Sequence, residues 1–448
     1  MSENKMGVMS VKKLIITMAL PMMLSMLVQA LYNIVDSFFV AKISENAVTA
    51  VTLVFPMQNL MIALGSGTGV GINAVLSKAL GAKNFKEANR SANTGIFLIA
   101  LTYVAFALLG FFAAAPFIHS QTEYADIAES AITYMRIVSV MSFGCFFQMT
   151  FERLLQSTGR TLMSMISQMT GAIINIILDP ILIFGLCGMP KLGVAGAAWA
   201  TVIGQIIAAI LALILNITTN KDIKLSLKDV LKPDKEITGK IYFVGIPSIL
   251  MMSIGSVMTY LMNRILGNFT STAQAVFGIY FKLQSFFFMP IFGLNNGLIP
   301  VMAYNYGAKN KARIMEALKF SVVLALSIMS VGSAVFLIFP DKLLSIFEAS
   351  DNMLEIGIPA LRIIALHYPV AAVCIILGTV FQAFAKSFYS LIISLGRQIV
   401  ILIPAAYLLS LTGVVGNVWW CFPMAEVSSL TLTLFFFRKV KKGIIDKL

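Results

Sequence analysis

The amino-acid sequence predicts an all-α polytopic membrane protein, with twelve transmembrane helices in two six-helix lobes related by a pseudo-two-fold axis along the membrane normal. Of the 448 residues, 58% are hydrophobic and only 12% are charged, against about 25% charged in soluble domains. The apolar residues gather in long runs, and the second half of the chain repeats the first. Helices are expected because each satisfies its own backbone hydrogen bonds in lipid.

Each apolar run is long enough to cross about 30 Å of hydrocarbon at 1.5 Å per residue. The runs in the first half are Leu14–Val40, Ala47–Leu76, Ala92–Ile118, Ile132–Leu155, Leu162–Leu186 and Val194–Leu215. Those in the second half are Ile241–Leu266, Ala273–Met302, Phe320–Phe339, Ile356–Phe384, Leu391–Leu411 and Val414–Phe437. The first run is too long for a signal peptide and ends without a small-residue cleavage pattern, so we expect it to be retained.

Lysines and arginines divide unevenly between the two sides of these spans. In the connections, 25 lie on the side of the termini and six on the other side. Because basic loops stay in the cytoplasm, we expect a multi-pass protein of the cytoplasmic (inner) membrane with both termini cytoplasmic. The net charge of +13 is thus explained by the basic connections that orient the protein in the membrane. No nucleic-acid partner is needed to explain this charge, and none is expected. The longest hydrophilic connection, 220–240, is interpreted as a cytoplasmic linker between an N-lobe (1–219) and a C-lobe (241–448).

An internal repeat supports the division into two lobes. The word Gly-Ala-Lys-Asn at positions 81–84 returns at 307–310, a shift of 226 residues, and further identities keep this register through the first five spans. A shared word in an ungapped register indicates duplication. Because each repeat has an even number of spans, the two lobes are expected to have the same topology, with the substrate path between them.

The first apolar run carries one acid, Asp36, and a polar stripe. Gln29, Tyr32 and Asn33 recur with it at three- and four-residue intervals, so a helix places them on one side. A membrane-embedded acid usually marks an ion or substrate pathway. We therefore expect Gln29, Tyr32 and Asn33 to line a substrate cavity. The alternative is that Asp36 is merely solvated at the headgroup boundary.

A second acid, Asp179, lies in the fifth span, one helical turn after Asn175. Pro180 has no N–H to donate to the carbonyl of Ile176, so that oxygen is left free. Together with Asp36 these oxygens would suit a proton or Na⁺, a hard cation. The alternative is that Asp179 caps a helix end, as Asp-Pro pairs often do.

The second half lacks these acids, because Asp36 and Asp179 correspond to Met262 and Ala405 at the shift of 226. The two lobes are therefore expected to differ in ion binding. Glu426, in the last span, is either a second protonatable group or a residue paired inside its own bundle, and the sequence leaves both open.

Other polar and soft residues in the spans have less specific interpretations. Lys282 is too deep to reach the surface easily, so it should be paired or line the cavity. Met289 lies in a Met- and Phe-rich segment that would suit lipophilic cations, or equally face lipid. We expect Glu152 and Arg153 to form an interfacial ion pair, and Arg397 to reach the cytoplasmic interface.

Several motifs together resemble the multidrug and toxic compound extrusion (MATE) transporters, in the prokaryotic branch of DinF- and MepA-like pumps. They are Asn-Ile-Val-Asp at 33–36, Leu-Asp-Pro at 178–180, Gly193 to Thr201, and Tyr-Asn-Tyr-Gly-Ala at 304–308. The resemblance implies a two-lobed exporter, expected as a monomer, that exchanges lipophilic and often cationic drugs for inward H⁺ or Na⁺. It places the cation site, including any Na⁺, on Asp36, Asn175, Asp179 and Thr201.

Other functional classes fit the sequence less well. A flippase for a lipid-linked precursor would share this architecture and stays as the alternative, although it should have a more cationic central cavity. An enzyme is not expected, because the two histidines, His119 and His367, and the four scattered cysteines form no nucleophile-base pair or metal motif. No cofactor is expected beyond the coupling ion, and the partners would be small lipophilic molecules and membrane lipids.

Overall fold

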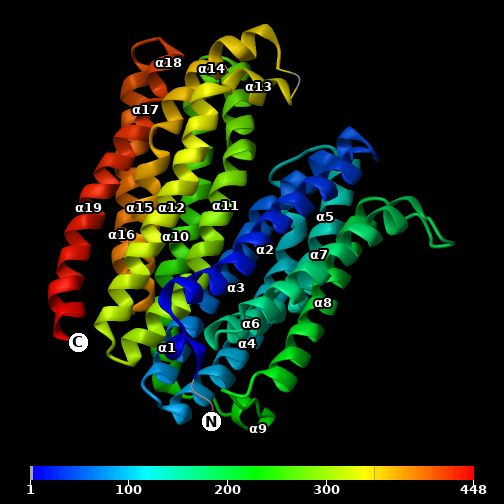
Figure 1. Ribbon diagram of the computed structural model, residues 1–448. Helices are drawn as coiled ribbons and strands as arrows, with labels where there is room; N and C mark the ends of the chain where they lie inside the picture. The colour runs from blue at the N-terminus through cyan, green and yellow to red at the C-terminus, as the bar shows by residue number, and fades with distance from the viewer. Residues whose placement is uncertain (1–3, 348) are drawn as a thin grey trace.

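The computed structural model describes residues 4–347 and 349–448, and this part of the chain is almost entirely helical. Two helical bundles lie side by side and join at one end (Figure 1). The first contains α2 (Val11–Ala41), α3 (Glu45–Gly81), α4 (Phe85–His119), α5 (Ala125–Val140), α6 (Phe143–Ser157), α7 (Thr161–Phe184) and α8 (Val194–Thr219). The second contains α10 (Lys235–Gly267), α11 (Ser271–Gly307), α12 (Lys311–Ile338), α13 (Pro340–Ser345), α14 (Asp351–Ala365), α15 (Tyr368–Ala383), α16 (Ser387–Leu395), the π-helix η1 (Gly396–Leu402), α17 (Ile403–Ser410), α18 (Val415–Val418) and α19 (Cys421–Gly443). The chain also contains the short helices α1 (Lys5–Val8), α9 (Leu227–Val230) and η2 (Ile445–Lys447).

The prediction of twelve spans in an all-helical, two-lobed fold is confirmed, with one refinement. In the described residues, ten helices are long and apolar enough to cross a membrane, and two bent pairs bring the number to twelve. The bent pairs are α5 with α6, at 42°, and α14 with α15, at 45°. They correspond to the fourth and tenth predicted spans, and the breaks fall at equivalent places, positions 141–142 and 366–367.

The repeated word Gly-Ala-Lys-Asn forms the same turn in both lobes. Its lysines, Lys83 and Lys309, have positive φ angles of 55° and 54°. Asn84 and Asn310 then begin α4 and α12, each accepting a hydrogen bond from the backbone N–H three residues ahead, at 3.1 and 3.2 Å. Such side-chain caps satisfy backbone donors that a helix leaves free at its start. The duplication therefore preserves a helix-start signal.

The connection between the lobes is tied to the first lobe. Helix α10 begins inside the segment 220–240, and Asp234 caps it by accepting from the backbone N–H groups of Glu236 at 2.9 Å and Ile237 at 3.2 Å. Arg90 of α4 pairs with the same carboxylate at 3.2 Å. The N–H groups of Ile237 and Glu236, with Arg90 nearby, hold the pKa of Asp234 below its usual range.

The lobes meet where glycines allow backbones to touch. A Cβ atom on Gly81 of α3 would overlap the carbonyl oxygen of Tyr304 in α11, and one on Gly307 would overlap the carbonyl oxygen of Lys78 in α3. The two contacts are equivalent, because positions 81 and 307, and 78 and 304, each differ by the repeat shift. Close approach through small residues is typical of helix packing in membranes.

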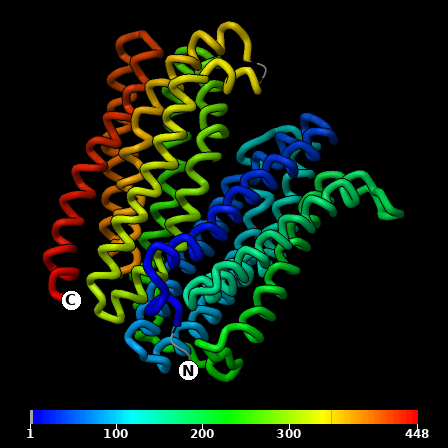
Figure 2. The backbone as a smooth tube through the Cα atoms, viewed as in Figure 1, coloured from blue at the N-terminus to red at the C-terminus, as the bar shows by residue number. Residues whose placement is uncertain are grey.

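Similar contacts join α2 to α11 and α3 to α10. A Cβ on Gly293 would lie 2.5 Å from the Cα of Met23, and a Cβ on Gly67 would lie 2.8 Å from the backbone nitrogen of Ile249. These contacts lie in the first half of α2 and α10 and slightly past the middle of α3 and α11, and both chain ends lie toward the end of the molecule where the lobes join (Figure 2). Beyond them the lobes diverge, toward the end that carries α13, α14 and α18 (Figure 1).

Candidate functional site

Asp179 is the most deeply buried acid of the first lobe, with none of its surface exposed. One orientation of the Asn175 side-chain amide gives both its nitrogen and its oxygen a hydrogen-bond partner. In this orientation Nδ2 of Asn175 donates to Oδ2 of Asp179 at 3.2 Å. The Asn175 oxygen then accepts from the backbone N–H of Thr201 at 3.0 Å and from its hydroxyl at 3.2 Å. The other carboxylate oxygen, Oδ1 of Asp179, is buried without a hydrogen-bond partner among the described residues.

The contact between Asn175 and Thr201 depends on the close packing of α7 against α8. A Cβ on Gly204 would lie 2.7 Å from the carbonyl oxygen of Gly171, and a Cβ on Gly171 would lie 3.0 Å from the carbonyl oxygen of Gly204. Without side chains at these two positions the backbones can approach each other. Asn175 lies one turn after Gly171, so the crossing holds it against Thr201.

Asp36 reaches the same region from α2, which packs against α7. Its Oδ1 is buried and has no partner among the described residues. The carboxylates of Asp36 and Asp179 are close enough to interact electrostatically, and the hydroxyl groups of Tyr32 and Thr201 lie near each other. The structure therefore brings together Asp36, Asn175, Asp179 and Thr201, with Tyr32 beside them.

Two further polar residues, Tyr134 and Gln58, border this group and were not anticipated from the sequence. Tyr134 is buried, and its hydroxyl accepts a hydrogen bond from Nε2 of Gln58 at 3.2 Å. Its ring lies near enough to interact with both carboxylates. Tyr134 is one of several polar residues of α5, and no spacing rule connects it to α2 or α7, so the sequence carried no signal that singled it out.

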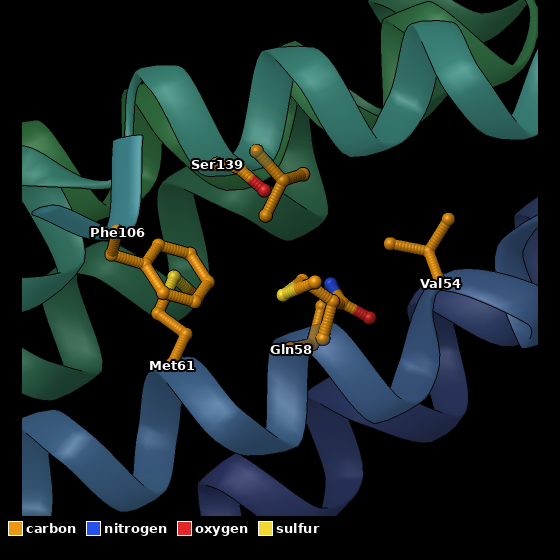
Figure 3. Close-up of a pocket in the computed structure, with 7 residues that line it drawn as sticks. Val54, Gln58, Met61, Phe106 and Ser139 are labelled. Carbon is orange, nitrogen blue, oxygen red and sulfur yellow. The ribbon is translucent and has the colours of Figure 1, made fainter. Parts of the chain in front are cut away.

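A small pocket lies on the other side of Gln58, between α3, α4 and α5 (Figure 3). Met61 and Phe106 lie close together on one side of it, and Val54 and Ser139 border the rest (Figure 3). Apart from Gln58 and Ser139 its lining is apolar. No acidic side chain lines this pocket, so we regard it as packing space within the lobe.

The residues expected to line a substrate cavity come from both lobes and differ in exposure. Gln29 accepts a hydrogen bond from Nε2 of Gln168 in α7, at 2.9 Å, and so belongs to the interior of the first lobe. Asn33 and Lys282 are exposed, and Met289 is half-buried. Lys282 and Met289 lie on α11, in the other lobe from the acids.

Two expectations for charged residues were wrong. Glu152 and Arg153 do not form an interfacial ion pair, because both are buried and bind different partners. Glu152 accepts hydrogen bonds from Gln148 at 3.0 Å and Ser167 at 3.3 Å. Arg153 donates across the lobe boundary to Asn296 of α11 at 3.1 Å. The expectation of an ion pair rested on adjacency in sequence, but consecutive helical residues point in different directions.

Arg397 also does not serve as an interfacial residue, because its Nη1 pairs with Oε2 of Glu426 at 3.1 Å inside the second lobe. This answers which partner Glu426 has. Arg397 lies in the π-helix η1, a widened turn that the sequence did not reveal.

In the described residues, no three His, Cys, Asp or Glu side chains gather in the manner of a transition-metal site. The ligands present near Asp36 are carboxylate, amide and hydroxyl oxygens. Oxygen ligands of this kind suit protons and hard cations.

A family model described as MatE matches residues 21–181 and 247–408 of this chain. The two matched segments begin 226 residues apart, which is the shift of the internal repeat.

Among curated proteins, the chain is 26% identical over 447 residues to the multidrug export protein MepA of Staphylococcus haemolyticus, covering 98% of this chain and 96% of that protein. It is 27% identical over 412 residues to MepA of Staphylococcus aureus strain NCTC 8325, covering 90% and 88%.

Two solved structures illustrate the similarity of the fold. A MATE crystal structure in complex with MaL6 superposes with a TM-score of 0.93 at 24% identity, covering all of both chains. The outward-facing conformation of a multidrug resistance MATE family transporter of the MOP superfamily gives 0.93 at 24% identity, covering 100% of this chain and 99% of the other.

Proposed function

Since the chain belongs to the MatE family of transporters, we propose that it exports lipophilic small molecules, including drugs, across the cytoplasmic membrane in exchange for inward H⁺ or Na⁺. Membership of a transporter family agrees with the expectation that the chain is not an enzyme. The coupling cation binds in the N-lobe (1–219), the C-lobe (241–448) completes the path, and a monomer suffices. The coupling site consists of Asp36, Asn175, Asp179 and Thr201.

One observation carries this proposal: two carboxylates from different helices meet inside the first lobe, each with a buried oxygen that has no hydrogen-bond partner within residues 4–347 and 349–448. Two ionised carboxylates in one buried place repel each other. A proton or a Na⁺ ion removes part of that repulsion and occupies the free oxygens. Asn175 and the hydroxyl of Thr201 add neutral oxygen or nitrogen partners that keep the acids in place.

Antiport follows if cation and substrate favour different conformations, because a ligand shifts a conformational equilibrium only by its difference in affinity for the two states. Asp36 lies on α2, and α2 packs against α11 of the other lobe at Met23 and Gly293. Neutralising Asp36 changes the side of α2 that faces α7. A change in the tilt or bend of α2, for which Pro21 is suited, would then alter how the lobes meet.

The coupling site is tested with Asp36→Asn in purified protein reconstituted into liposomes. The amide keeps the shape of the carboxylate but cannot be protonated or ionised, so the protein should fold and insert while uphill export stops. The measurement is efflux of a lipophilic dye such as rhodamine 6G under separately imposed H⁺ and Na⁺ gradients, which also identifies the ion. We expect at least a tenfold loss of rate, the equivalent of about 1.4 kcal/mol.

Met262→Ala provides the matched control, since position 262 is the counterpart of position 36 in the other lobe. It should export at a rate close to that of the unmodified protein under the same gradient. Near-normal uphill export by Asp36→Asn would refute the coupling role of Asp36. Equal losses in both variants would refute the difference between the lobes.

A further inference from the structure

Helix α11 touches the first lobe at Gly293, Gly297 and Gly307. Near its middle, Gly293 and Gly297 touch the backbone of α2, where a Cβ on Gly297 would lie 2.8 Å from the Cα of Ala19. At 3.6 residues per turn the same face continues backward through positions 289, 286, 282, 278 and 275.

The exposure of α11 follows this face. Ala275, Gly278, Lys282 and Phe286 are exposed, whereas the other residues from 273 to 285 are buried or half-buried. The stripe that packs against α2 at Gly293 thus becomes open where the two helices diverge (Figure 1). By helical periodicity these four residues lie on the side of α11 that meets the first lobe further along the helix. We call these residues, together with the corresponding positions of α2, α3 and α10, the inter-lobe cleft.

Near the level of Lys282, the corresponding positions of the other three central helices carry no charge, and one turn beyond Tyr260 the exposed stripe of α10 ends in Arg264. We identified these positions by counting along each helix in steps of three or four residues, away from the contact between the lobes. The count starts at Met23 on α2, Gly67 on α3 and Ile249 on α10. The positions are Met26, Ala30, Asn33 and Ser37 on α2; Thr52, Pro56, Leu60 and Ala63 on α3; and Met252, Ser256 and Tyr260 on α10. Asp36 directly precedes Ser37, so its side chain is rotated about 100° around the axis of α2 from that of Ser37. It points to the side of α2 that meets α7. Among the positions near the level of Lys282, which the structure describes in full, Lys282 alone is charged.

Lys282 also has no neutralising partner. No described carboxylate forms an ion pair with it, and it lies eleven residues, about 16 Å, outward from the contact at Gly293. A single charge on low-dielectric walls attracts ligands of the opposite sign. Phe286, 40% exposed and one turn from Lys282 on α11, and Met252, 41% exposed on α10, provide aromatic and apolar surface in the same lobe.

We infer that the inter-lobe cleft binds amphiphiles with an acidic group, whose anionic end pairs with Lys282 while the apolar body lies against Phe286 and Met252. This deepens the proposed function, on which it rests, by naming a substrate class other than cations. The anionic end can come from a free organic acid or from the headgroup of an acidic lipid, since both offer the same chemistry to an ammonium group.

Three pyrene compounds with the same apolar body test this inference in the full-length purified protein: 1-pyrenebutyrate, 1-pyrenebutanol and a pyrenebutyl trimethylammonium salt. Binding is measured by energy transfer from the protein's tryptophans, without any ion gradient. We expect the anion to bind about tenfold more tightly than the alcohol, and the cation to bind less tightly than the alcohol. Lys282→Met should abolish the preference for the anion, and Lys282→Arg should retain it.

Lys342→Met is the matched control, because Lys342 is an exposed lysine on α13 outside the inter-lobe cleft. It should keep the preference of the unmodified protein. Unchanged binding of 1-pyrenebutanol by Lys282→Met shows that this variant is folded. A preference for the anion that survives Lys282→Met, or a cation bound as tightly as the anion by the unmodified protein, would overturn the inference.

The two sources of the anion are distinguished by adding phosphatidylglycerol or phosphatidylcholine to the micelles. If phosphatidylglycerol displaces 1-pyrenebutyrate and phosphatidylcholine does not, and if Lys282→Met removes this displacement, the site binds acidic lipids as well as free acids. Competition by neither lipid assigns it to free acids, and both results support the site. Because binding is measured without a gradient, a failure of ion coupling at Asp36 would leave this preference intact, and the two proposals can fail separately.

Discussion

At the scale of single residues, the ion pair of Arg397 with Glu426 joins positions 29 residues apart. Glu426 is 3% exposed, and its second oxygen has no partner among the described residues. Removing one member of a buried pair leaves a charge without compensation and typically costs about 3–5 kcal/mol. The Arg397→Met variant, purified in detergent, should therefore unfold at a clearly lower temperature than the unmodified protein.

The double variant Arg397→Met/Glu426→Leu provides the comparison, because replacing both members of a buried ion pair with apolar residues is often neutral. It should recover most of the lost stability. If the single and double variants unfold at the same reduced temperature, the pair does not hold this part of the lobe together.

Residue identities predicted the acids of the site but not all of their partners. Asp36 and Asp179 stood out because acids are rare in apolar spans, and Asn175 followed from helical spacing. Tyr134 and Gln58 could not be found in this way, since their position beside the acids depends on how α5 and α3 cross the other helices. The same limit explains Glu152 and Arg153, whose partners lie on helices remote in sequence.

At the scale of helices, the crossing of α7 and α8 sets the distance between Asn175 and Thr201. Gly204→Ala would place a Cβ 2.7 Å from the carbonyl oxygen of Gly171, so the two helices must move apart. Overpacking of this kind costs about 1–3 kcal/mol. We expect a lower unfolding temperature together with weaker ion-driven efflux.

Gly239→Ala is the control for this crossing, because nothing lies within 4 Å of a Cβ at Gly239 in α10. Alanine there should leave stability unchanged or raise it by about 0.5–1 kcal/mol, through the greater helix propensity of alanine. An equal loss of stability in both variants would mean that alanine acts on the helices themselves and not on their crossing.

Helix positions could be predicted well from apolar runs, and the repeat predicted two similar lobes. The bend at positions 366–367 lies beside Pro369, a proline expected to kink its helix. The bend at 141–142 could not be predicted, because no proline lies at the break and an apolar run looks the same whether it is straight or bent. The π-helix η1 was missed for the same reason.

At the scale of the whole molecule, the prediction that 220–240 is cytoplasmic can be tested with the protein's own cysteines. Cys187, between α7 and α8, is exposed, and the other three cysteines are buried. In intact cells an impermeant maleimide should label Cys187. It should not label Lys228→Cys in a Cys187→Asn background, because basic connections stay inside.

Permeabilised cells supply the control, since both cysteines should react there. Labelling of the cysteine at position 228 in intact cells, with Cys187 protected, would mean that the protein is inserted with the opposite orientation.

The reciprocal contacts of Gly81 with Tyr304 and of Gly307 with Lys78 have a consequence for the origin of the molecule. Each lobe offers its neighbour the same patch that it receives, which is how the two subunits of a two-fold symmetric dimer meet. A half-length ancestor carrying this patch would have been complementary to a second copy of itself. The fused chain keeps that self-complementarity, while its two halves have since become different in their charges: acids inside the first, and Lys282 on the open face of the second.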